Sequence, residues 1–153
     1  MAIESAICNS FKQEILVEGH NFTNGTDAFK LALFTSSATL SKSTTAYTAP
    51  TDGTASPTST HEVSSTSTGY TTGGNALTST TPVLSGDTAC CKFADTSFTS
   101  ASFTARGCLI YNSTNSNKAV CAINFGADKT VTSGTFTIQF PAQTAGNAII
   151  QIA

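Results

Sequence analysis

The chain has 153 residues and a mass of 15.7 kDa, which is enough for one domain with a buried core. Charged residues make up only 10% of the sequence, the formal net charge is −2, and Arg106 is the single arginine. Nucleic-acid binding needs clustered Lys and Arg, and a membrane-spanning helix needs roughly 20 apolar residues, so this composition argues against both kinds of partner.

Residues 9–19 are predicted to form one short helix near the N-terminus. Ser10 and Gln13 have the spacing of a capping box, in which side chains bond the free backbone N–H groups of the first turn. Gly19 is a typical helix terminator because it tolerates the left-handed conformation. The Asn-Gly pair at 24–25 then predicts a turn before the first strand.

Residues 29–35 are predicted to form that first strand. Phe29, Leu31 and Leu33 alternate along the segment and therefore share one face. Lys30 begins the opposite face, which is more mixed in character. The pattern is typical of a strand that packs at least one of its faces against a core.

Residues 36–82 are dominated by Ser, Thr, Gly and Pro and carry only isolated apolar residues. A loop of this length is unusual inside a compact domain. We therefore expect an extended, Ser/Thr-rich excursion with one or two short strands, which could drape over a neighbouring subunit or add a strand to its sheet. A disordered linker is the alternative, but apolar residues on both sides favour one continuous domain over 1–153.

The remainder of the chain has the pattern of short strands separated by turn residues. The predicted strands are 88–93, 98–103, 107–112, 118–125, 135–140 and 148–152. The predicted connections are a hairpin loop at 112–117 and turns at 126–129 and 133–134. This spacing predicts a mainly β fold, an antiparallel β-sandwich or jelly-roll-like domain with one short N-terminal helix.

Five cysteines are the most informative residues for function, because an odd number cannot pair completely within one chain. They are Cys8, Cys90, Cys91, Cys108 and Cys121. The segment 1–8 lacks the basic region and apolar run of an export signal, so synthesis in a reducing cytoplasm is expected. Any pairing should then occur late, and a leftover thiol makes each of the five a candidate for a disulfide to a neighbouring subunit.

Alternation along the strands predicts which faces carry these thiols. If Phe93 points inward, Cys91 is inward and Cys90 is outward, and Cys121 shares the core-facing parity of Ile123. Alternation does not decide which face carries Cys108. Cys8 precedes the helix, on a segment expected to be mobile. Buried cysteines would act only as small apolar side chains, so cross-linking falls mainly to Cys90 and Cys8.

The sequence offers no recognisable catalytic or metal-binding motif. No Gly-x-Ser-x-Gly elbow occurs, and no Gly-Lys-Ser/Thr follows the Gly73-Gly74 pair to make a phosphate loop. Structural zinc favours paired ligands such as Cys-x-x-Cys, which are absent, and His61-Glu62 lacks the second histidine of a zincin helix. We therefore expect no enzyme activity, no cofactor and no metal.

Four stretches of the chain together resemble a known family. They are DAFKLALFTSSATLSKSTTAYT at 27–48, GYTTGGNALT at 69–78, FADTSFTSASFTARGCLIYN at 93–112 and NFGADKTVTSGTFTIQFP at 124–141. In order and extent they resemble a family of small β-rich proteins encoded in the structural gene clusters of tailed bacteriophages. The resemblance implies a component of the virion, on the head or at the neck and tail, and it brings no catalytic motif.

The resemblance also implies what the cysteines are for. Family members usually carry Ala, Val or similar residues where this chain has Cys90, Cys91, Cys108 and Cys121, which implies a virion reinforced by disulfides. The expected function is therefore a non-enzymatic accessory virion protein that decorates or links head subunits and stabilises the particle. Its expected partners are capsid, neck or sheath proteins and further copies in a homo-oligomer or symmetric array. The alternatives are a neck or collar protein joining head and tail, and a receptor- or glycan-binding fibre module.

Overall fold

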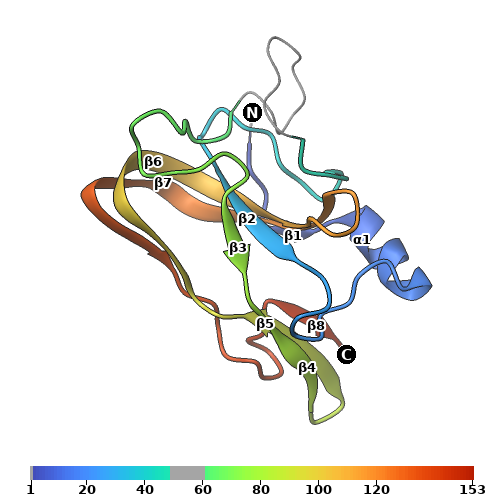
Figure 1. Cartoon of the computed structure of the whole chain (residues 1–153). Coiled ribbons are helices and arrows are strands. Elements are labelled where there is room, and N and C mark those ends of the chain that lie inside the picture. Colours follow the sequence, from blue (N-terminus) through green and yellow to red (C-terminus); the bar gives the residue numbers. More distant parts are fainter. Residues whose placement is uncertain (1, 49–60) are drawn as a thin grey trace.

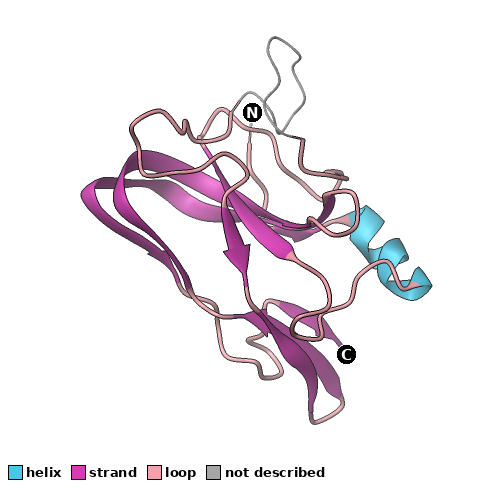
Figure 2. Cartoon of the chain, in the orientation of Figure 1, coloured by secondary structure: helices cyan, strands magenta, loops and turns pink. Residues whose placement is uncertain are grey.

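The computed structural model describes residues 2–48 and 61–153, and it consists mainly of antiparallel strands (Figures 1 and 2). The larger sheet has five strands in the order β1-β7-β6-β2-β3. Their bounds are β1 Ala6–Ile7, β2 Phe29–Phe34, β3 Asn75–Leu77, β6 Thr96–Asn112 and β7 Lys118–Ile138. The predicted mainly β, antiparallel fold is thus confirmed, and β2 matches its predicted bounds to within one residue.

A smaller sheet lies at one end of the molecule and has three strands in the order β4-β5-β8 (Figure 1). Their bounds are β4 Ser79–Ser85, β5 Thr88–Phe93 and β8 Ile150–Ile152. Strand β5 has the predicted bounds, β8 is the C-terminal part of predicted strand 148–152, and β4 lies partly inside the expected excursion. The two sheets are joined in the core, where the rings of Phe29 and Phe93 lie 5.5 Å apart.

The predicted helix is present but shorter and differently capped. Helix α1 covers Asn9–Glu14 and continues as a 3₁₀ turn over Ile15–Val17. The capping box is wrong, because the N-cap makes no side-chain hydrogen bond and the buried hydroxyl of Ser10 has no partner within the described residues. At the C-terminal end Glu18 takes the left-handed conformation (φ 58), and the N–H of Gly19 donates to the carbonyl of Glu14 at 2.7 Å.

Aromatic rings fill the core between the sheets and the helix. Phe22 stacks on Phe29 with ring centroids 4.6 Å apart, and Phe11 meets Phe22 edge-on at 5.9 Å. These side chains are at most 4% exposed. Each fully buried ring contributes about 2 kcal/mol through removal of its apolar area from water, so this cluster fixes α1 against the sheets.

The described parts of the 36–82 segment pack on their own domain. Leu40, Tyr47, Val63 and Tyr70 are all buried. The segment also supplies β3 and the start of β4, which confirms the expectation of one or two short strands. Contact of this segment with a neighbouring subunit stays a prediction for 36–48 and 61–82, and residues 49–60 lie outside the described residues.

Strands β6 and β7 form one long ribbon that pairs from Asn112–Lys118 to Thr96–Ile138. The loop predicted at 112–117 connects them, which confirms that hairpin. Each of the two strands merges a pair of predicted ones: 98–103 with 107–112, and 118–125 with 135–140. The chain therefore reverses less often than the turn residues indicate.

The turns predicted at 126–129 and 133–134 are wrong, because β7 continues through both positions. The register instead jumps there: Ala105 pairs with Lys129 but Gly107 pairs with Asn124, so residues 125–128 bulge out. Gly126 has φ 81 and Ser133 has φ 48. Residues that tolerate positive φ serve bulges as well as turns, and bulges bend a strand without reversing it.

Candidate interaction surface

All five cysteines are buried free thiols, with at most 9% of each residue exposed. This confirms the inward placement of Cys91 and Cys121. The outward placement of Cys90 is wrong, since its exposure is 0%. The loop after β7 lies next to this position, because the Gln143 side chain donates to the carbonyls of Thr81 and Cys90. Alternation, which assigned the Cys90 side chain to solvent, takes no account of a neighbouring loop.

The other thiols are equally enclosed. Cys108 is 0% exposed within the large sheet, and Cys8 is 0% exposed at the start of α1, where its N–H donates to the Val120 carbonyl at 3.0 Å. The expected mobile segment around Cys8 is therefore wrong. Burial raises the pKa of the Cys8 thiol to about 11 and that of Cys121 to about 12. Because the thiolate is the reactive form, these side chains are chemically inert near neutral pH.

A histidine lies in a polar cluster that resembles a catalytic arrangement but is saturated. The His20 side chain is fully buried, and its Nε2 donates to the Glu14 carboxylate at 2.8 Å. Its Nδ1 accepts from the Asn112 amide at 3.2 Å, and that amide also donates to Asp27 at 2.7 Å. Both ring nitrogens are thus occupied, so the cluster ties α1 to the end of β6 and has no free base to offer.

A second polar cluster surrounds Glu62. Its carboxylate accepts hydrogen bonds from the Tyr47 and Tyr70 hydroxyls and from the N–H of Gly73 at 2.7 Å. Tyr111 donates to the carbonyl of Gly73 at 2.7 Å. Burial and the nearby carboxylate raise the pKa of all three tyrosines. The neutral phenols therefore stay donors, and they hold the described part of the Ser/Thr-rich segment onto the large sheet.

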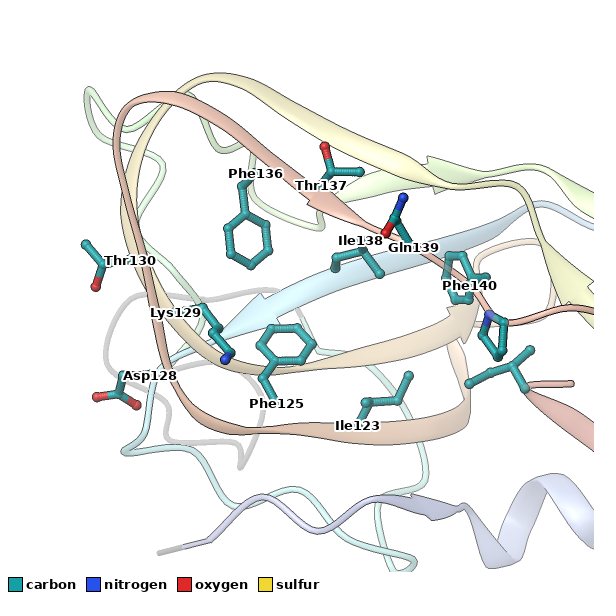
Figure 3. Close-up of a pocket in the computed structure, with 12 residues that line it drawn as sticks. Ile123, Phe125, Asp128, Lys129, Thr130, Phe136, Thr137, Ile138, Gln139 and Phe140 are labelled. Carbon is teal, nitrogen blue, oxygen red and sulfur yellow. The ribbon is translucent and has the colours of Figure 1, made fainter. Parts of the chain in front are cut away.

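Strand β7 curls around an apolar groove of about 660 Å³ (Figure 3). Phe125 and Phe136 point into the curl from its two arms, with ring centroids 6.2 Å apart. Ile138 and Phe140 continue the lining, and Asp128 lies at the groove's polar end, where Arg106 holds it at 3.3 Å. The bulge over 125–128 creates this shape, which no sequence pattern indicated.

Exposed apolar side chains gather at a different place. Among the described residues, every large hydrophobic side chain that is exposed lies at the end formed by the 3₁₀ turn and the small sheet. They are Leu16 (83%), Val17 (71%), Val83 (47%), Leu84 (75%) and Ile152 (55%). We call this end of the molecule the apolar end; within it, Val83 projects from the opposite face of the small sheet to Leu84 and Ile152. A solvent-facing cluster of large apolar side chains marks an interaction site more often than chance.

The strand register shows that part of this surface is one continuous row. Leu84 of β4 pairs with Ala89 of β5, and Ala89 pairs with Ile152 of β8. Directly paired residues project from the same face of a sheet. The face therefore carries Leu84, Ala89 and Ile152 side by side across all three strands.

Two grooves separate this face from the helix. One, of about 690 Å³, is lined by Pro82, Ala89 and Glu18 among others. The other, of about 300 Å³, is lined by Lys12 and Leu16 among others. Both grooves share Ile15 and Ile152, so these two side chains form the divide between them.

Within the described residues, no group of three or more His, Cys, Asp or Glu side chains could hold a metal ion. No helix among those residues has the length and apolar character needed to span a membrane. Comparison with protein-family models, curated proteins and solved structures found no match.

Sequence reasoning missed the apolar end entirely. Leu16 and Val17 occur in a predicted helix, where apolar residues are normally assigned to the core. Leu84 and Val83 fall at the edge of the expected excursion and carry no periodic signal. One signal was present: three consecutive apolar residues at 15–17 exceed what one face of a short helix can bury.

Proposed function

We propose that this chain is a non-enzymatic accessory structural protein of a tailed-phage virion. It decorates or links head subunits and stabilises the particle by binding its assembled form. The sequence resemblance of four ordered stretches supports the virion assignment, and a collar position between head and tail is the alternative placement. The observation that carries the proposal is the apolar end, since its exposed side chains become favourable only when a neighbour covers them.

The chemistry of the polar clusters supports a role without catalysis. His20 has both ring nitrogens occupied, and Glu62 is held by two tyrosine hydroxyls and a backbone N–H. Each cluster satisfies its own groups, as expected for structural networks. A hydrolytic site would need a nucleophile beside a base with a free nitrogen or oxygen.

The thiols enter this proposal differently from the sequence expectation. Contact through the apolar end is noncovalent and needs no thiol. A disulfide from Cys90 or Cys8 to a neighbouring subunit stays a prediction. Because both thiols are buried, the structure around them would have to open before they could react. Denaturing electrophoresis of intact particles with and without reductant tests it: a 15.7 kDa band in both lanes contradicts the disulfide and leaves the noncovalent proposal standing.

Attachment to the particle tests the main proposal. Leu84→Asp places a charge in the apolar row, and Ala127→Asp places the same charge on the exposed bulge of β7 as the matched control. We expect Leu84→Asp to reduce co-sedimentation with particles lacking the native protein by about tenfold or more. Ala127→Asp should bind like wild type. Equal binding by both variants would contradict attachment through the apolar end.

A receptor- or glycan-binding module is the second candidate, and one observation favours it. The β7 groove combines three aromatic rings with the polar side chains of Asp128 and Gln139, a mixture suited to holding a sugar ring. Glycan-array binding that is lost in Phe136→Ala and kept in Leu84→Asp would favour this function over the structural one.

A further inference from the structure

We propose that the apolar end binds a second copy of this chain, forming a two-fold symmetric dimer through the helix and the small sheet. The inference deepens the proposed function and rests on it, because the neighbour that covers the apolar end in the particle is then a second copy of this chain. It assigns that surface a partner of defined chemistry.

The divide between the two grooves is the natural centre of such a contact. Ile15 and Ile152 line both grooves, so one groove lies on each side of them. In a two-fold contact the same patch meets itself, and every element on one side of the axis faces its counterpart from the other side. An axis near Ile15 therefore sets the larger groove of one copy against the smaller groove of the other.

The charges beside the divide are complementary under that symmetry. Lys12 lines the smaller groove and Glu18 lines the larger one. They stand three residues before and three residues after Ile15, so antiparallel packing of the α1 segment on its copy places Lys12 opposite the partner's Glu18. The symmetry repeats this pair, giving two opposite-charge contacts at the rim of an apolar centre. That arrangement is typical of specific interfaces.

The shapes are complementary as well. Leu16 lines the smaller groove and is 83% exposed, the largest exposure among the big apolar side chains of the described residues. Across the proposed axis it faces the partner's larger groove, where Pro82 and Ala89 offer an apolar wall. A protruding side chain and a groove to receive it thus occur on one surface. A second copy supplies the counterpart of both by symmetry, so a surface that carries both is suited to bind itself.

The neighbouring acidic groups do not oppose this packing. Asp27 lines the larger groove, but its carboxylate accepts hydrogen bonds from the N–H of Asn21 and the amide of Asn112. His20, in the same groove, is bonded on both nitrogens. Beside the divide, the carboxylate that remains available to a second copy is that of Glu18, and it would face Lys12 of that copy.

A charge-swap experiment on the purified full chain tests the dimer. Sedimentation equilibrium should show a reversible dimer in wild type at about 100 μM. Lys12→Glu and Glu18→Lys each create two like-charge contacts, and we expect each to weaken dimerisation about tenfold or more. The double variant carrying both changes restores opposite charges and should return to within about threefold of wild type. Lys129→Glu on β7 is the matched control and should dimerise normally.

A further variant tests whether loss of the dimer is separate from loss of the fold. Leu16→Asp should abolish the dimer while far-UV circular dichroism and thermal midpoint stay near wild type, because the side chain is already in solvent. A monomeric wild type, or a double variant no better than the single ones, would overturn the proposal. If the wild type is monomeric while Leu84→Asp still loses particle binding, the homodimer fails and the virion role stands. If the dimer forms but particles bind Leu84→Asp and Ala127→Asp equally, the homodimer stands and attachment to the particle through the apolar end fails.

Discussion

The large-sheet region and the apolar end treat their apolar side chains in opposite ways. In the large sheet, Leu31, Leu33 and Ile110 are 0% exposed. At the apolar end, Leu16 and Leu84 are 83% and 75% exposed. Both regions belong to one short chain with few charges, so the difference is one of location and not of overall composition. The buried side chains of the large-sheet region stabilise the fold, whereas those of the apolar end remain exposed and available to a binding partner.

The polar groups follow the same division. Around the large sheet, the carboxylate of Glu62 and the ring of His20 are bound on every side by groups of the chain itself. Beside the apolar end, Lys12 and Glu18 lie on the exposed rims of grooves. The region that is complete in itself therefore holds the fold, and the incomplete region is where a neighbour would bind.

The largest expected difference between the two regions concerns truncation of apolar side chains. Phe29→Ala removes a fully buried ring from the aromatic core and should lower the free energy of unfolding by about 3–5 kcal/mol. Leu84→Ala, at 75% exposure, should change it by less than about 0.5 kcal/mol. Urea unfolding of the dilute protein measures both. Comparable losses would mean that the apolar end is part of the core.

Glycines at positive φ sharpen the comparison at the level of the backbone. Gly74 has φ +75, and an added Cβ would lie 1.7 Å from the Leu31 carbonyl oxygen, so Gly74→Ala should cost more than about 2 kcal/mol. Gly86, in the turn between β4 and β5, has φ +64 with nothing within 4 Å of the added atom. Gly86→Ala should therefore cost only about 1 kcal/mol of conformational strain. Thermal midpoints of the two variants give the order, and a reversed order would refute this account of the close approach.

The buried thiols predict a smaller, pH-dependent effect. Burial raises the pKa of Cys121 from 9.0 to about 12, so above pH 9 the unfolded chain loses this proton while the folded chain keeps it. Stability from this group is complete below pH 9 and falls as the pH rises towards 12. In Cys121→Ala, the free energy of unfolding should decline less steeply between pH 9 and 11 than in wild type. The comparison is made after subtracting the loss of stability that the substitution causes at pH 7. Parallel stability curves for the two proteins would show that Cys121 is not protected from solvent.

The sequence predicted elements with strong local patterns and missed contacts made over long distances. Strand β5 was placed with its bounds, because strand-forming residues end there at turn residues on both sides. Gly126 and Ser133 were recognised as residues of unusual conformation, but local sequence cannot tell a bulge from a reversal. Cys90 is buried next to a loop whose Gln143, more than fifty residues away, donates a hydrogen bond to the Cys90 carbonyl. Alternation alone carries no information about such a neighbouring loop.

Side-chain footprinting of the chain in assembled particles, compared with the free protein diluted to its monomeric state, tests the central claim most directly. If the apolar end is where neighbours bind, then Leu16, Leu84 and Ile152 become protected from hydroxyl radicals on assembly. Phe136 in the β7 groove should be labelled equally in both states. Unchanged labelling of the three apolar side chains, with new protection of Phe136, would place the binding surface in the β7 groove and contradict the account.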